Sequence, residues 1–178
     1  VLLWNIPNLA LSVWFLVGSF AILSLWLGHT ILLRKNTELT LIYAAASDKW
    51  AIALSTIELI GITLHSFLVY TGNSNAEIFW LLATSITLTA IIYRTYQQLT
   101  NWAFYSIGWC LELLVAQILG FGEPSIIKIG IANIALGLTT QLFGEWWHRK
   151  YQAQYQNIPQ SFHILPIIYG AFSVLLRF

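Results

Sequence analysis

Residues 108–120, GWCLELLVAQILG, decide the fold class, because apolar side chains surround a single carboxylate, Glu112, on both sides. When the segment is extended back to Trp102, it approaches the roughly 20 mostly apolar residues that cross a bilayer as a helix. A helix satisfies its backbone hydrogen bonds within itself, which lipid requires. We therefore predict a membrane-spanning helix that carries a carboxylate about 15 Å along its axis, close to the bilayer midplane.

The composition of the whole chain agrees with this prediction. The 178 residues are 58% hydrophobic and 8% charged, whereas soluble domains carry about 25% charged residues. We therefore expect the lipid bilayer to be the first partner of the chain. A net charge of +1 gives no reason to expect nucleic acid. The only cysteine, Cys110, excludes an internal disulfide and a cysteine-based zinc cluster, and we predict no metal site.

The hydrophobic pattern predicts an all-α, polytopic transmembrane bundle of about six helices in a single domain, residues 1–178. Because the chain starts at Val1, has no methionine and ends in SVLLRF, we expect it to be part of a longer chain. The predicted spans are residues 9–33, 50–70, 77–93, 102–120, 126–147 and 162–178.

Basic residues predict the orientation, because lysine and arginine are enriched in cytoplasmic loops. Lys128 and Arg177 lie on the other side from all the remaining basic residues. We therefore expect Val1 on the non-cytoplasmic side. Within residues 34–49, LTLIYAAA is too short to span and either extends the second helix or lies in the interface. The basic residues on the predicted cytoplasmic side are Arg34, Lys35, Lys49, Arg94, Arg149 and Lys150.

The second to fifth spans suggest a repeated helical hairpin, residues 50–100 and residues 102–155. When the two segments are aligned, Glu58 falls on Glu112 and Leu82 falls on Leu136. Both hairpins enter the membrane from the same side, so a duplication would be a parallel repeat.

Glu58 and Glu112 lie at similar depth in two spans that run in the same direction. A charged side chain at the bilayer centre costs roughly 2.5–3.5 kcal/mol or more. One hypothesis is a proton or ion relay through both carboxyls. The other is a pair of protonated glutamates that hydrogen-bond neighbouring helices, which the lack of a nearby proline break favours. The relay candidates are Glu58, Glu112, His65, Asn133 and Gln141.

His29 and His65 are candidate ligands for a chlorophyll-type pigment, because both lie within predicted spans. Their depths differ, so they cannot hold one haem between them. The alternative is that each histidine is interfacial or hydrogen-bonded within the bundle.

The end of the fifth span combines indole rings with basic groups, which is typical of a membrane-interface anchor. A docking surface for a soluble partner is the alternative. The residues concerned are Trp146, Trp147, His148, Arg149 and Lys150.

Residues 108–120 and residues 131–150, IANIALGLTTQLFGEWWHRK, resemble segments of uncharacterised multi-pass membrane proteins of cyanobacteria. The resemblance implies a bacterial plasma membrane or a thylakoid membrane and transfers no active residues.

The chain contains no Walker loop, GxGxxG, HExxH or GxSxG motif, so we predict no enzymatic activity. We expect a structural or assembly subunit, or the membrane anchor of a larger protein or complex with other membrane subunits. The alternatives are a proton-coupled transporter or channel module that uses Glu58 and Glu112, and a pigment-binding subunit.

Overall fold

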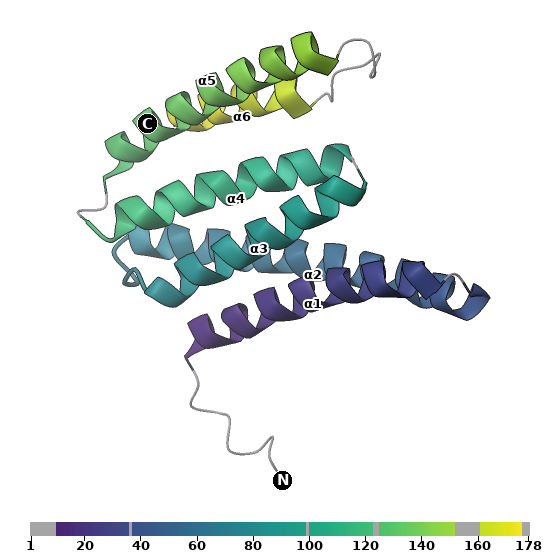
Figure 1. The fold of residues 1–178 in the computed structure, drawn as a ribbon. Helices are drawn as coiled ribbons and strands as arrows, with labels where there is room; N and C mark the ends of the chain where they lie inside the picture. Colours follow the sequence, from purple (N-terminus) through teal and green to yellow (C-terminus); the bar gives the residue numbers. More distant parts are fainter. Residues whose placement is uncertain (1–9, 36, 99, 123–124, 152–160, 176–178) are drawn as a thin grey trace.

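The computed structural model describes residues 10–35, 37–98, 100–122, 125–151 and 161–175. These residues form helices and short connections, and the described part of the chain contains no strand. Helices that follow one another in the sequence run antiparallel (Figure 1). The helices are α1 (Leu11–Lys35), α2 (Glu38–Tyr70), α3 (Ile78–Gln97), α4 (Asn101–Gly120), α5 (Ile126–Tyr151) and α6 (Ser161–Leu175).

Five of the described helices, α1 to α5, are long and apolar enough to cross a membrane. This confirms, for the described residues, the prediction of an all-helical chain with helices that are long and apolar enough to span a membrane. The described part of α6 has 15 residues, fewer than a perpendicular crossing needs. The six-span count and the repeated hairpins therefore stay predictions.

Helix α2 has 33 residues because the segment LTLIYAAA is helical and continuous with the predicted second span. Thr37 and Thr40 form a capping box: Thr40 N donates to Thr37 Oγ1 at 3.4 Å, and Thr37 N donates to Thr40 Oγ1 at 2.9 Å. Of the two alternatives from the sequence, the structure thus has the helix extension. At 1.5 Å per residue, α2 is about 50 Å long, so it reaches beyond a hydrocarbon layer of about 30 Å.

Helices α1 to α4 form the main bundle, which we call the four-helix part. Its core combines apolar side chains from every one of these helices with the small residues that allow close packing. Its core residues are Ile22, Trp26, Ala51, Leu59, Ile62, Trp80, Ala83, Ala90, Ile91, Ala103, Cys110 and Leu113.

Helices α5 and α6 pack on each other as a C-terminal hairpin beside α4 (Figure 1). Gly137 lies against α6, since a Cβ there would be in ordinary van der Waals contact, 3.6 Å, with the backbone of Pro166. The hairpin reaches α4 through Tyr169, whose hydroxyl donates to Gly108 O at 2.7 Å. The outer face of α5 exposes apolar side chains such as Ile127, at 75%, and Leu142, at 67%, as a lipid-facing helix does.

The two ends of the four-helix part differ in their charge. The α1–α2 and α3–α4 connections lie at one end, which we call the basic end because it holds Lys35, Lys49 and Arg94. The opposite end holds the α2–α3 turn and the start of the α4–α5 connection (Figure 1). Gly72 takes a φ of 76° in the α2–α3 turn, a conformation that favours glycine.

Candidate functional site

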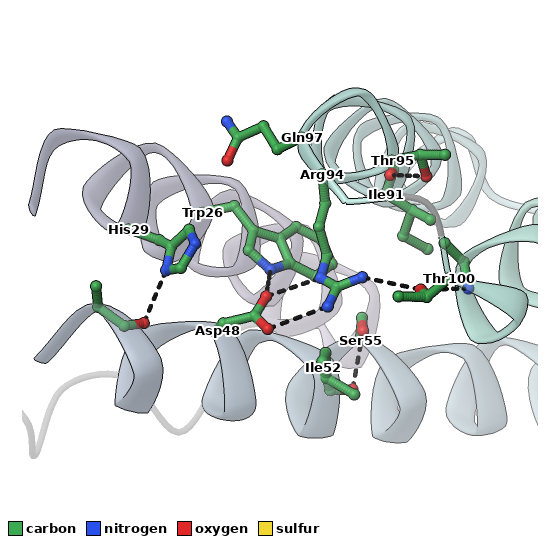
Figure 2. Close-up of polar contacts among 12 residues, drawn as sticks. Trp26, His29, Asp48, Ile52, Ser55, Ile91, Arg94, Thr95, Gln97 and Thr100 are labelled. Carbon is green, nitrogen blue, oxygen red and sulfur yellow. Dashed lines mark hydrogen bonds and ion pairs between the residues drawn. The ribbon is translucent and has the colours of Figure 1, made fainter. Parts of the chain in front are cut away.

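Asp48 of α2 and Arg94 of α3 form an ion pair at the basic end (Figure 2). The contact is bidentate, because Arg94 Nε donates to Asp48 Oδ1 at 2.7 Å and Nη2 donates to Oδ2 at 3.0 Å. The side chain of Arg94 is 7% exposed and that of Asp48 is 18% exposed. Removing one partner of such a pair is costly, because it leaves the other charge buried and uncompensated.

Two further helices contact this ion pair. Trp26 of α1 donates its indole N–H to Asp48 Oδ1 at 3.0 Å. Arg94 Nη1 donates to Thr100 Oγ1, the N-cap of α4, at 3.2 Å. The guanidinium carbon also lies 5.6 Å from the ring centroid of Trp102, within cation–π range. One ion pair therefore connects α1, α2, α3 and α4.

Glu58 is the deepest carboxyl of the four-helix part and is 4% exposed. Its Oε1 lies 2.7 Å from Ser19 Oγ of α1 and accepts from Thr87 Oγ1 of α3 at 3.1 Å. Its Oε2 lies beside Gly18, where an added Cβ would come within 3.2 Å. The side chain of α2 thus joins both neighbouring helices at one layer of the bundle.

The surroundings of Glu58 suit a neutral carboxylic acid. Ser19 Oγ lies 2.9 Å from Phe15 O as well as 2.7 Å from Glu58 Oε1, but a hydroxyl has only one hydrogen to donate. A protonated Glu58 can donate to Ser19, which then donates to Phe15 O, while Thr87 donates to the carboxyl. Every hydroxyl then has an acceptor, and no charge has to be held in the bilayer.

Glu112 of α4 has fewer partners than Glu58. It is half-buried and lies beside Asn133 of α5. Asn133 is 1% exposed, yet its Nδ2 makes no well-formed hydrogen bond to the described residues. Gln141, farther along α5, is exposed. The structure therefore brings Glu112 to Asn133, leaves Gln141 outside the bundle, and shows no contact between the two glutamates among the described residues.

His65 lies at the opposite end from the ion pair and borders a small cavity. Its ring stacks on Trp80, with centroids 4.0 Å apart and planes 12° apart. Ser74 Oγ of the α2–α3 turn lies 3.3 Å from His65 Nε2. The cavity is also lined by Ser66 and Gln117 and measures about 10 Å³.

His29, the other candidate pigment ligand, lies near the basic end. It is 8% exposed, and its Nδ1 lies 2.8 Å from Ala44 O, a contact that joins α1 to α2 (Figure 2). His29 and His65 thus occupy different ends of the bundle, as their positions in the sequence predicted, and each ring packs against other parts of the chain.

The predicted docking segment at the end of α5 is described only in part. Trp146 is 48% exposed and its ring lies 5.5 Å from that of Phe143. Arg149 forms an exposed ion pair with Glu145 at 3.8 Å. The side chains of Trp147, His148 and Lys150 lie outside the described part of the structure.

The chain matches no protein-family model, no curated protein and no solved structure. Within the described residues, no group of three or more histidine, cysteine, aspartate or glutamate side chains could hold a metal ion. The proposal of a function therefore rests on the contacts inside the bundle.

Sequence reasoning did not single out the pairing of Asp48 with Arg94. The available signal was a single acidic residue near the start of the second predicted span and a single basic residue at the end of the third. Antiparallel neighbours place these two positions at the same end, so opposite charges there predict a pair. Trp26 carries no such signal, because its indole N–H is directed to Asp48 only by the packing of α1 on α2.

Proposed function

We propose that this chain is a non-enzymatic integral membrane bundle that acts as a structural or assembly subunit, or as the membrane anchor of a larger protein or complex. One observation carries the proposal: the buried charged and carboxyl groups of the four-helix part contact neighbouring helices. Glu58 hydrogen-bonds to two other helices, and the pair of Asp48 with Arg94 connects four helices. Polar groups used in this way make a rigid frame in the bilayer.

The exposed apolar side chains are consistent with this role but do not identify the partner. The residues on the outer face of α5, among them Ile131 at 64% and Leu138 at 59%, suit either lipid or another membrane subunit.

Native mass spectrometry after gentle solubilisation from the membrane of origin tests the proposal. We expect a species heavier than any simple multiple of the chain, with the additional mass belonging to other polypeptides. Masses that correspond only to one chain or to simple multiples of it would contradict the subunit role and favour an autonomous transporter.

A proton-coupled transporter or channel module is the second candidate, and a specific observation favours it. Thr84 and Thr87 lie about one turn apart on α3, and both are fully buried. Thr87 donates to Glu58, and Thr84 contacts Gln117 Oε1 at 3.1 Å. A line of polar groups thus runs from the cavity at the opposite end towards Glu58.

Proton flux into liposomes loaded with a pH-sensitive dye tests this second candidate. If the line carries protons, Glu58→Gln and Thr87→Val both abolish the flux while the protein stays folded. Glu112→Gln is the matched control, because Glu112 lies outside this line. A flux that is absent from the unmodified protein, or is unaffected by both substitutions, would exclude this function for Glu58.

For localisation, we propose a bacterial plasma membrane or a thylakoid membrane, with the basic end in the cytoplasm or its equivalent. The distribution of basic residues supports the orientation. Cys110 is buried, so Cys110→Ala gives a background for single cysteines at Gln98 and Asn73, which are exposed at the two ends. We expect a membrane-impermeant thiol reagent added from the non-cytoplasmic side to label Asn73→Cys; labelling of Gln98→Cys instead would reverse the orientation.

A further inference from the structure

We infer that the cavity beside His65 is a binding site for one water molecule, held by the side chains of His65, Ser66 and Gln117. The site lies at the opposite end of the four-helix part from the ion pair. The inference does not depend on the proposed function, because it concerns the hydration of the bundle and holds for a scaffold and for a transporter alike.

The size of the cavity agrees with a single water. The cavity measures about 10 Å³, and roughly 10–15 Å³ is the least that accommodates one water. Its lining includes the aromatic side chains of Tyr70 and Trp80 and the turn residues Ala76 and Glu77.

Three buried polar atoms at this cavity lack a hydrogen-bond partner among the described residues. They are His65 Nδ1, Ser66 Oγ and Gln117 Nε2. Ser66 is 8% exposed and Gln117 is 7% exposed, so solvent at the surface does not reach them directly. An unpaired buried polar group destabilises the folded state. A buried water typically makes about three hydrogen bonds, which equals the number of unpaired polar atoms at this cavity.

The contacts of Thr84 define which end of the Gln117 amide faces the cavity. Thr84 Oγ1 lies 2.9 Å from Trp80 O and 3.1 Å from the Gln117 amide, but its hydroxyl has one hydrogen. When Thr84 donates to Trp80 O, it can accept from the amide N–H₂ of Gln117. The amide oxygen, which has nearly the same shape as the nitrogen, then faces the cavity as an acceptor. In this arrangement the amide nitrogen of Gln117 donates to Thr84, and its amide oxygen accepts from the water.

The chemistry of the lining favours a neutral ligand over a cation. The buried groups that face the cavity are an imidazole, a hydroxyl and an amide. Glu77, the lining carboxylate, is exposed at the turn. Water can both donate and accept hydrogen bonds. It can donate its two hydrogens to Ser66 Oγ and to the Gln117 amide oxygen, and its oxygen can accept from His65 Nδ1. Ser74 of the α2–α3 turn contacts the other ring nitrogen of His65, which leaves Nδ1 for the water.

Water-edited solid-state NMR of the full chain in phosphatidylcholine nanodiscs, with ¹⁵N-labelled histidine, tests this site. The measured quantity is the rate at which magnetisation passes from water to each imidazole ring. The His65 signal is assigned by its loss in His65→Gln. We expect rapid transfer to His65 and slow transfer to His29, a buried histidine that contacts the backbone oxygen of Ala44.

Substitutions at the lining separate bound water from general exposure. Ser66→Ala and Gln117→Leu should each slow the transfer to His65 severalfold, whereas Ser85→Ala should not, because Ser85 Oγ donates to Leu81 O within its own helix. Ser66→Ala is small enough to keep the fold if Gln117→Leu does not. Transfer to His65 that is as slow as to His29, or that neither substitution changes, would overturn the inference. A His65 signal that moves when sodium or ammonium chloride is added would show a cation site and overturn it as well.

Discussion

Glu58 and Glu112 lie on two helices that run in the same direction, yet their environments differ. Glu58 is 4% exposed and hydrogen-bonds to Ser19 and Thr87 on two other helices. Glu112 is half-buried beside one amide, that of Asn133. The comparison teaches that the depth of a carboxyl in a membrane does not decide its role. What differs between the two carboxyls is the number of helices that bring hydrogen-bonding groups to them.

The same contrast separates the four-helix part from the C-terminal hairpin. In the four-helix part, polar contacts between helices occur near the basic end, at the middle layer and at the opposite end. The hairpin reaches α4 through Tyr169 and Leu165, both of which contact Gly108. We therefore expect substitutions in the four-helix part to have larger effects on the free energy of unfolding.

The largest effect is expected for Arg94→Ala. It leaves the half-buried Asp48 without its cation and should lower the free energy of unfolding by about 3 kcal/mol, the lower end of the cost of breaking a buried pair, measured by SDS-driven unfolding in mixed micelles. Arg149→Ala is the control, because its ion pair with Glu145 is exposed and should contribute less than about 1 kcal/mol. Equal effects of the two substitutions would contradict the role of the Asp48 pair.

A smaller effect is expected for Glu58→Leu, which removes the hydrogen-bond partner of Ser19 and Thr87. Leaving a buried donor unpaired costs about 1–3 kcal/mol, and Ser19 retains Phe15 O as an alternative acceptor, so we expect a loss of about 2 kcal/mol in the same assay. Glu58→Gln keeps an acceptor oxygen and should be milder. If Glu58→Gln were the more damaging of the two, the carboxyl would have a role beyond joining helices.

Gly108→Ala tests how the hairpin is attached. A Cβ at Gly108 would lie 2.8 Å from the Tyr169 hydroxyl and 2.9 Å from the end of the Leu165 side chain, so these two side chains have to shift. Overpacking of this kind costs typically 1–3 kcal/mol. Gly130→Ala is the matched control on α5, where an added Cβ meets nothing within 4 Å; it should be neutral or stabilising. An unchanged stability in Gly108→Ala would show that α6 does not pack on α4 as described.

The smallest effect is expected for Glu112→Leu. Glu112 is half-buried and contacts a single amide, so its replacement should change the free energy of unfolding by less than about 1 kcal/mol. The measurement is the same unfolding assay, run beside Glu58→Leu. A loss larger than that of Glu58→Leu would reverse the order of the two carboxyls.

The helical fold could be predicted from the sequence, because length and hydrophobicity alone identify membrane-spanning helices. The positions of the helix ends were harder to predict from the sequence. Residues 38–49 are helical because of the capping box of Thr37 with Thr40 and the packing of α2 on α1, and the hydrophobic pattern of a span does not report either of these.

The candidate site was predictable only in part. The position of Glu58 among helices followed from its depth, but its donors, Ser19 and Thr87, did not. Serine and threonine are frequent in spanning helices and often bond their own backbone, as Ser24 does with Phe20 O. Which hydroxyl reaches across to another helix depends on helix rotation. The equivalence of Glu58 with Glu112 rested on sequence alignment, and alignment does not report how many helices surround a position.

Two double-mutant cycles test the central claim most directly, namely that Glu58 joins helices while Glu112 does so weakly. One cycle combines Glu58→Ala with Thr87→Ala, and the other combines Glu112→Ala with Asn133→Ala. The first should give a coupling energy of about 1 kcal/mol, the net value of a typical hydrogen bond, and the second should give a value near zero. Coupling between Glu112 and Asn133 that equals or exceeds coupling between Glu58 and Thr87 would contradict the account.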